Sequence, residues 1–167
     1  MRLFVAVHFT PEVKSMLLSA IEDLRRQSGG NFTRPENLHL TLAFIGESDR
    51  VADAKAALSA VTAVPFELTL SGTGRFGDIY WAGIEKNPAL SALADSVRSE
   101  LLKRNIQIDT KPFKAHITLA REVQARDVKL NIRPASMTVS RISLMCSDTI
   151  NGKLTYTEVF GKSLTAH

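Results

Sequence analysis

A four-residue pattern of histidine, apolar residue, threonine and apolar residue occurs twice in the chain. His39-Leu40-Thr41-Leu42 lies early and His116-Ile117-Thr118-Leu119 lies late, each inside an apolar run. Side chains alternate between the two faces of a β-strand, so His and Thr share one face and the aliphatic residues share the other. Each pattern therefore predicts a strand that packs its aliphatic face on a core and turns His and Thr toward a groove.

The two patterns end a longer repeat. The shift that brings His39 onto His116 also brings Thr10-Pro11 onto Asn87-Pro88 and Arg34-Pro35 onto Lys111-Pro112. Thr or Asn followed by Pro is typical of a helix N-cap and first helical position. Each copy therefore predicts a strand, a capped helix, a loop with a basic residue before proline, and a His/Thr strand. We interpret residues 2–46 and 79–123 as the copies of an internal duplication within one unit of residues 1–167.

The remaining elements follow from hydrophobic periodicity and turn residues. Predicted helices cover residues 11–27, 51–61 and 88–103, with Ser48 or Asp49 as the cap of the second. Predicted strands cover residues 2–8, 38–45, 66–70, 79–85, 136–145 and 154–160, besides the late His/Thr strand ending near Arg121. Asn151-Gly152 predicts a hairpin turn, and residues 71–74 predict a turn or bulge. Residues 122–131 form either a short helical turn or a loop, and residues 162–167, with His167, are expected to be a frayed tail.

Composition limits the classes of function. The net charge of +4 and the pI of about 9.4 favour an anionic ligand such as nucleic acid. A single cysteine, Cys146, excludes an internal disulfide and a Cys-rich zinc site, and we expect it to pack as a small apolar residue. No apolar run is long enough to cross a bilayer, and no targeting segment is recognisable. We therefore expect a cytoplasmic protein without a membrane partner.

Two histidines facing one groove predict acid/base chemistry. An imidazole titrates near neutral pH, so one histidine can accept a proton while the other donates one on the opposite side of a reacting centre. The two threonine hydroxyls can donate hydrogen bonds to the non-bridging oxygens of a tetrahedral anion, as in a phosphodiester. Neither pattern contains a carboxylate, so we expect no metal ion and no cofactor.

These blocks resemble the two-histidine (2H) phosphoesterase superfamily, and more closely its bacterial and archaeal RNA 2',3'-cyclic phosphodiesterases, also called 2'-5' RNA ligases (LigT-like). The resemblance lies in residues 2–6, 37–46, 111–121 and Tyr156. It implies an α+β, bilobal fold with two pseudo-symmetric antiparallel sheets, outer helices and a central groove. It also implies metal-independent opening of an RNA 2',3'-cyclic phosphate to a 2'-phosphomonoester, with 2'-5' ligation in some members. His39 would be the general acid, His116 the general base, and Thr41 and Thr118 would hold the phosphate.

Further site residues follow from the family pattern. Arg121 is expected to bind the phosphate, although on a straight strand it would point away from His116, and the alternative is an exposed strand-end arginine. Phe44 holds the matching place in the first copy and either stacks on a base or packs in the core. The other expected RNA contacts are Arg34, Lys114, which stands where related proteins often carry His, and Tyr156, each with a structural alternative. We expect Tyr80 and Trp81 in the core and a structural role for His8.

The expected partner is RNA with a 2',3'-cyclic phosphate end, tRNA fragments included, bound by a monomer. Two alternatives stay open. One is a phosphodiesterase that acts on 2'-5' oligonucleotides or small cyclic nucleotides by the same chemistry. The other is a non-catalytic RNA-binding module, which the two intact His/Thr patterns disfavour because binding alone does not need paired titratable groups.

Overall fold

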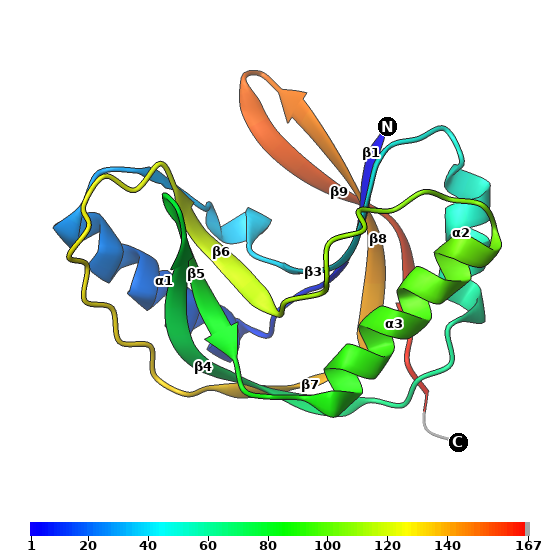
Figure 1. Cartoon of the computed structure of the whole chain (residues 1–167), viewed down its shortest axis with the longest axis horizontal. Coiled ribbons are helices and arrows are strands. Elements are labelled where there is room, and N and C mark those ends of the chain that lie inside the picture. Colours follow the sequence, from blue (N-terminus) through cyan, green and yellow to red (C-terminus); the bar gives the residue numbers. More distant parts are fainter. Residues whose placement is uncertain (166–167) are drawn as a thin grey trace.

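The chain folds into two antiparallel β-sheets that carry helices, as a computed structural model describing residues 1–165 shows (Figure 1). The strand orders are β3-β1-β8-β9 in the first sheet and β2-β6-β5-β4-β7 in the second. The first sheet comprises β1 (Arg2–Val7), β3 (Leu40–Glu47), β8 (Arg141–Ile150) and β9 (Lys153–Ser163). The second comprises β2 (Asn31–Phe32), β4 (Phe66–Phe76), β5 (Ile79–Ile84), β6 (His116–Arg121) and β7 (Ser136–Val139). The predicted α+β fold is confirmed.

Helices α1 (Pro11–Gln27) and α3 (Pro88–Lys103) have the predicted bounds. The backbone N–H of Val13 donates to Thr10 Oγ1 at 3.5 Å, and that of Leu90 donates to Asn87 Oδ1 at 3.0 Å. Each cap is followed by a proline, whose missing N–H would have had no partner in the first helical turn. Local sequence therefore determines where both helices begin. The shorter elements are α2 (Val51–Ala60) and the 3-10 helix η1 (Pro35–Asn37).

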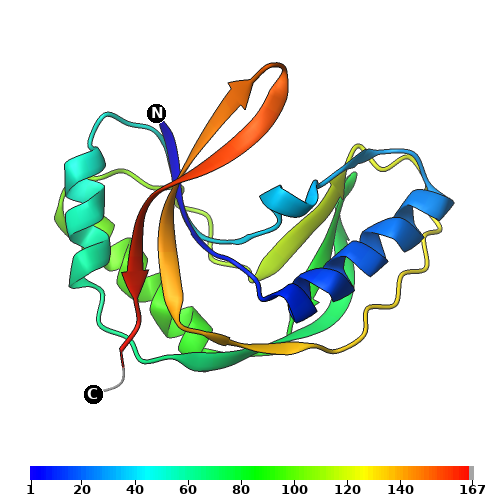
Figure 2. The same cartoon turned by 180° about the vertical axis from the view of Figure 1, so that it is seen from behind.

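Two helices cross from one sheet to the other. Helix α1, which follows β1 of the first sheet, contacts β6 of the second, and α3, which follows β5 of the second sheet, contacts β3 of the first as well as β4 (Figures 1 and 2). Helix α2 packs beside α3 and contacts β8. One continuous apolar core results, whose fully buried leucines include Leu17, Leu24, Leu42, Leu93 and Leu101. Each sheet therefore packs against a helix that follows a strand of the other sheet.

The chain changes sheets at Ser140. Strand β7 pairs with β4 in the second sheet, whereas β8 pairs with β1 and β9 in the first. The expected single strand over residues 136–145 is wrong for this reason. The frayed tail is also wrong for residues 162–164, because β9 continues to Ser163 and the N–H of Leu164 donates to the carbonyl of Ser140 at 2.8 Å. His167 lies outside the described residues.

Strands β8 and β9 form a long hairpin that projects from the body of the molecule (Figure 1). Its turn residues Asn151 and Gly152 have φ values of 52° and 76°. A two-residue turn of type I′ requires positive φ at both central positions, so the predicted hairpin is confirmed. The predicted bulge near Gly72 is also present, as a register shift between Leu70 and Thr73 where β4 pairs with β5.

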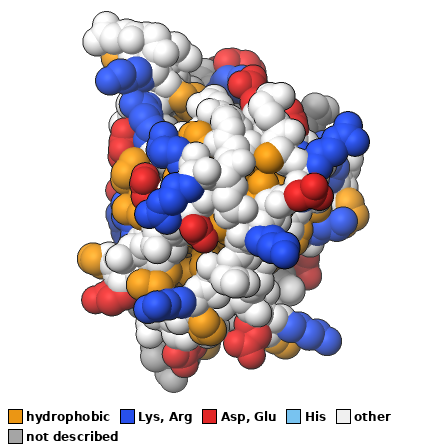
Figure 3. Space-filling model, turned by 90° about the vertical axis from the view of Figure 1, so that its left-hand side faces the viewer, with side chains coloured by type: hydrophobic (Ala, Val, Ile, Leu, Met, Phe, Trp, Pro, Cys, Tyr) orange, Lys and Arg blue, Asp and Glu red, His pale blue; other side chains and the backbone are white. Residues whose placement is uncertain are grey.

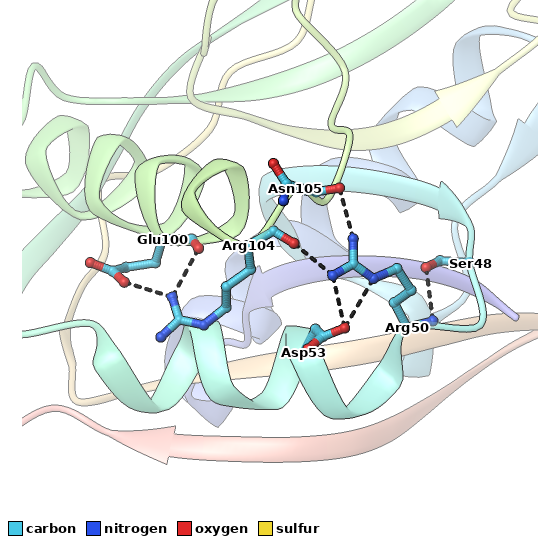
Figure 4. Close-up of polar contacts among 6 residues, drawn as sticks. All are labelled: Ser48, Arg50, Asp53, Glu100, Arg104 and Asn105. Atoms are coloured by element: carbon cyan, nitrogen blue, oxygen red, sulfur yellow. Dashed lines mark hydrogen bonds and ion pairs between the residues drawn. The ribbon is translucent and has the colours of Figure 1, made fainter.

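Arg50 joins the start of α2 to the end of α3 (Figure 4). Its guanidinium donates to the carbonyls of Arg104 at 2.6 Å and Asn105 at 2.8 Å, and its Nε donates to Asp53 at 2.9 Å. Carbonyl groups at a helix C-terminus have no partner inside the helix, so a cation there stabilises them. Ser48 Oγ accepts from the backbone N–H of Arg50, while the predicted side-chain cap on α2 itself is not formed. No helix within the described residues is long and apolar enough to cross a membrane.

Candidate active site

A cavity of about 770 Å³ brings the two His/Thr patterns together. Strands from both sheets, the β8–β9 hairpin and the segment around η1 line it. Its charged lining residues are Arg2, Arg34, Arg121 and Lys153, and none of the described residues that line it is Asp or Glu. A hollow with cations and no carboxylate attracts an anion. In Figure 3, several Lys and Arg side chains form a row below the projecting top of the molecule, and others are scattered over the rest of that face.

The four predicted residues of the His/Thr patterns all line this cavity. Thr41 in β3 and Thr118 in β6 are half-buried, and the aliphatic residues beside them are fully buried in the core. The alternation that the sequence predicts is therefore present in both strands. Within residues 1–165, no three His, Cys, Asp or Glu side chains are grouped as metal ligands would be.

Each histidine ring is held by a hydrogen bond of the same kind, between Nδ1 and a backbone carbonyl oxygen two residues earlier. Nδ1 of His39 lies 2.7 Å from the carbonyl oxygen of Asn37, and Nδ1 of His116 lies 2.6 Å from that of Lys114. A carbonyl oxygen can only accept, so Nδ1 carries the proton in each ring. In the neutral imidazole, Nε2 then has the free lone pair. Each ring is therefore prepared to accept or return a proton through Nε2.

The surroundings of His39 are apolar. The rings of Phe4 and Tyr156 lie 4.9 Å and 5.1 Å from the His39 ring, between centroids. Phe4 also packs with Ala6 and Met145 in a small apolar cluster separate from the main core. Burial lowers the pKa of His39 below its usual value, and the hydrogen bond to Asn37 opposes this effect in part. The positive charge of Arg121 contributes to the lowering. His39 is therefore mainly neutral at pH 7.

A β-bulge in each His/Thr strand determines which side chain follows threonine into the cavity. In β6, Trp81 pairs with Thr118 and the adjacent Tyr80 pairs with Ala120, so Leu119 is the extra residue. In β3, Ala6 pairs with Thr41 and Val5 with Ala43, so Leu42 is the extra residue.

The bulge reverses the alternation of faces. Leu119 and Ala120 are consecutive buried residues, and so are Leu42 and Ala43. Arg121 and Phe44 consequently return to the cavity face, and both line the cavity. The expectation that Arg121 points away from His116 holds only for a strand without this bulge.

The β8–β9 hairpin forms one wall of the cavity and is fastened to the segment around η1. The carbonyl oxygen of Leu154 accepts from Asn37 Nδ2 at 3.1 Å and from the guanidinium of Arg34. Arg34 also pairs with Glu36 at 3.4 Å. Tyr156 lies on this wall, where burial raises its pKa. Asn37 thus fastens the hairpin with its side chain and orients His39 with its backbone.

Comparisons with known proteins agree with this geometry. The sequence profile of the 2'-5' RNA ligase superfamily matches residues 13–150. The chain belongs to the 2'-5' RNA ligase superfamily. An RNA 2',3'-cyclic phosphodiesterase from Archaeoglobus fulgidus is 37% identical over 128 residues, which are 72% of this chain and 72% of that protein.

Solved structures of the superfamily share the whole fold. Escherichia coli LigT, crystallised with 3'-AMP, matches with a TM-score of 0.89 and 27% identity over 99% of this chain and 98% of that one. A Thermus thermophilus protein matches with a TM-score of 0.89 and 30% identity over 100% of both chains. The resemblance inferred from the His/Thr patterns is therefore confirmed.

One residue predicted to contact RNA, Lys114, is not among the residues that line the cavity. Nζ of Lys114 lies 5.8 Å from the ring centroid of Phe76, whose ring packs against that of His116 and is not part of the cavity lining. Trp81 does not belong to the core, so the expectation for it is wrong, whereas Tyr80 is buried there as expected. Trp81 pairs with Thr118 in the sheet and lies on the same face. Gly74 opposite leaves room for the indole ring on that face.

Sequence reasoning missed three cavity residues with clear roles in its geometry. Phe4 and Arg2 come from β1, which read as a central apolar strand, and Asn37 precedes the first pattern directly. The alternation of side chains along β1 could have predicted the position of Phe4. Phe4 and Ala6 share one face of this strand, and Leu3 and Val5 share the opposite face, which packs on the main core. The packing of Phe4 on Tyr156 joins residues far apart in sequence and leaves no local pattern.

Proposed function

We propose that the protein is an RNA 2',3'-cyclic phosphodiesterase that hydrolyses a terminal 2',3'-cyclic phosphate to a 2'-phosphomonoester. The observation that carries this proposal is the pair of histidines with matched Nδ1 hydrogen bonds in one cationic cavity. The names of relatives such as the Archaeoglobus fulgidus enzyme support the substrate class.

In the proposed reaction, His116 is the general base and His39 the general acid. His116 Nε2 accepts a proton from water as the water oxygen bonds to phosphorus. The bond from phosphorus to the ribose 3'-oxygen breaks, and protonated His39 donates its proton to that oxygen. The products are a 2'-phosphate and a free 3'-hydroxyl.

Thr41, Thr118 and Arg121 hold the non-bridging phosphate oxygens in this scheme. Their positions on the cavity lining support that role, and a guanidinium adds charge-assisted hydrogen bonds. The bound anion also acts on His39. Its negative charge opposes the positive charge of Arg121, which contributes to the lowering of the His39 pKa. Substrate binding therefore favours the protonated His39 that the acid step needs.

The residues that we propose to contact RNA have different roles. Phe44 and Tyr156 offer aromatic faces on the cavity lining, where a base can stack. Arg34 lines the cavity while it is bound to Leu154 and Glu36, so we assign it mainly to the cavity wall. We further propose a monomer formed from two repeat copies, since one chain supplies both histidines. We also propose a cytoplasmic location. The proposed substrates are RNA fragments, tRNA fragments included.

The test is hydrolysis of a short RNA that ends in a 2',3'-cyclic phosphate, in EDTA, with the product identified by phosphorus NMR. We expect a 2'-phosphate from the wild-type protein, and no turnover from His39→Ala or His116→Ala proteins that remain folded by circular dichroism. Binding of the RNA without turnover by the wild type would favour the non-catalytic module. Loss of activity in EDTA would contradict the metal-independent mechanism.

The two roles can be separated with bis(p-nitrophenyl) phosphate, whose leaving group needs no proton. A variant that lacks the general acid should retain far more of its activity on this diester than on RNA. A variant that lacks the general base should lose activity on both substrates. We expect the first behaviour for His39→Ala and the second for His116→Ala, and the reverse result would exchange the roles.

A further inference from the structure

Asn37 lies between the β8–β9 hairpin, the η1 segment and His39, and it contacts all three. Its side-chain Nδ2 donates to the carbonyl oxygen of Leu154 at 3.1 Å. Its backbone N–H donates to the carbonyl oxygen of Arg34 at 2.9 Å, and its own carbonyl accepts from Nδ1 of His39 at 2.7 Å. Asn37 is only 6% exposed. A buried amide is costly without hydrogen bonds, so the carbonyl of Leu154 determines where the Asn37 side chain can lie.

The hairpin reaches His39 by a second route, through Tyr156. Leu154 and Tyr156 are two residues apart on β9, so their side chains share a face of the strand, and both line the cavity. The Tyr156 ring lies edge-on to the His39 ring, with the centroids 5.1 Å apart. The hairpin therefore packs against the imidazole with one residue and, through Asn37, holds the carbonyl that binds its Nδ1. A displacement of the hairpin would disturb His39 at both points.

Among residues 1–165, the matching residue before the second His/Thr pattern has no such link to the hairpin. The carbonyl of Lys114 accepts from Nδ1 of His116 at 2.6 Å, as that of Asn37 does from His39. The side chain of Lys114 is exposed, however, and its Nζ lies near the ring of Phe76. A backbone carbonyl is therefore sufficient to hold a histidine ring. The side-chain bond from Asn37 to the hairpin is an additional feature on the His39 side.

The proposed reaction makes strict demands on the direction of His39. In a phosphoryl transfer the attacking and leaving oxygens lie roughly in line, so Nε2 of His39 must meet the leaving ribose oxygen opposite the water at His116. A displacement of about 1 Å at such a group can lower the rate by roughly 100-fold. The imidazole ring is rigid, so the bond that holds Nδ1 also determines where Nε2 points.

We propose that Asn37 is a positioning residue, through which the β8–β9 hairpin holds His39 in line with the leaving ribose oxygen. This inference rests on the proposed function and adds to it a residue that acts through His39. The hairpin that offers Tyr156 to the RNA and the histidine that protonates the ribose oxygen are then joined by the side chain of Asn37. Substrate binding and proton transfer therefore depend on the same position of the hairpin.

The test variant is Asn37→Ala, which removes the bond to Leu154 and keeps the backbone carbonyl that holds His39. A general acid contributes about 10²–10⁴-fold, so kcat on RNA with a 2',3'-cyclic phosphate end should fall by roughly tenfold or more. The leaving group of bis(p-nitrophenyl) phosphate needs no proton, so kcat on this diester should fall by less than about threefold. A loss confined to RNA indicates a misplaced His39, because general damage to the fold would lower both activities.

The matched control is Asn87→Ala, which removes another amide that binds a backbone carbonyl. Nδ2 of Asn87 donates to the carbonyl oxygen of Glu67 at 2.8 Å, and its Oδ1 caps α3, outside the cavity lining. This variant should also lose stability. At a temperature where it is folded, both of its activities should stay within about twofold of the wild type, because it shares no partner with the site.

NMR of the imidazole protons tests the link without turnover. In Asn37→Ala, the Nδ1 proton of His39 should exchange with water faster than in the wild type, while that of His116 should keep its rate. Unchanged exchange at His39, an unchanged kcat on RNA, or an equal fall of both activities would overturn the positioning role. Absence of RNA hydrolysis by the wild type would instead refute the proposed function, and proton exchange at His39 would then decide the role of Asn37 by itself.

Discussion

Replacing Arg121 by alanine tests whether the bulge in β6 delivers a phosphate-binding group. A hydrogen bond to a charged group contributes about 1.5–3 kcal/mol. Arg121 is exposed at the rim of the cavity, so water screens part of this energy and the lower half of the range applies. The expected loss of about 1.5–2 kcal/mol corresponds to a fall in kcat/KM of roughly 10- to 30-fold. Arg121→Lys keeps the charge without the planar fork, so its kcat/KM should fall between that of the wild type and that of Arg121→Ala.

The assay is steady-state hydrolysis of a short RNA with a 2',3'-cyclic phosphate end at fixed ionic strength. Thermal unfolding should be unchanged, because none of the ion pairs among residues 1–165 includes Arg121. The matched control is Arg126→Ala, an exposed arginine on the loop after β6 that does not line the cavity. We expect this control to retain kcat/KM within about twofold, as a distant surface charge should.

A result within twofold of the wild type for Arg121→Ala would refute this reasoning, provided that His116→Ala is inactive in the same assay. It would mean that the reversed alternation after Leu119 brings Arg121 to the cavity rim without contact to the phosphate. A loss that disappears at high salt would indicate long-range attraction of RNA in place of a direct hydrogen bond.

Further predictions concern His39 and the helix ends. Tyr156→Leu should raise the pKa of His39 toward the usual 6.5, because burial is the main cause of the lowered value. An NMR pH titration of the His39 ring measures this change, and the control variant Phe76→Leu should leave the titration unchanged. Below pH 6.5, His39 binds more protons in the unfolded chain than in the folded protein, so the free energy of unfolding measured in urea should decrease as the pH falls below that value. A free energy of unfolding that does not change with pH would contradict the lowered pKa. Arg50→Ala should cost about 1–2 kcal/mol of unfolding free energy in urea, because the carbonyls at the end of α3 lose their donor. Arg26→Ala, an exposed helical arginine paired with Asp23, is its control and should cost under about 0.5 kcal/mol.

The sequence predicts what depends on local periodicity. Helices α1 and α3 have the expected bounds because capping residue, proline and apolar spacing all lie within a few turns of each other. The His/Thr faces follow from alternation, and the Asn151-Gly152 turn from backbone preference. These signals suffice to bring His39, Thr41, His116 and Thr118 to one groove.

The rest depends on partners far apart in the chain. The bulge that redirects Arg121 is defined by the register between β5 and β6, which the sequence of β6 alone does not reveal. The change of sheet at Ser140 is set by two different pairing strands. Trp81 shares a face with Thr118 through the pairing of β5 with β6, and Gly74 on the neighbouring strand leaves space for its ring.

Helices α1 and α3 pack on opposite sheets, and His39 and His116 belong to a single chain. This arrangement matters because two histidines must have different surroundings to act as an acid and a base. Two separate half-chains that lent each other a helix would form a dimer with its two-fold axis between the histidines. Identical subunits would give both rings the same surroundings and the same affinity for a proton. Within a single chain the two His/Thr strands are free to differ, and among the described residues that line the cavity aromatic rings pack against His39 alone of the two histidines. The acid and base roles that we propose for His39 and His116 therefore depend on different surroundings for two strands of similar sequence.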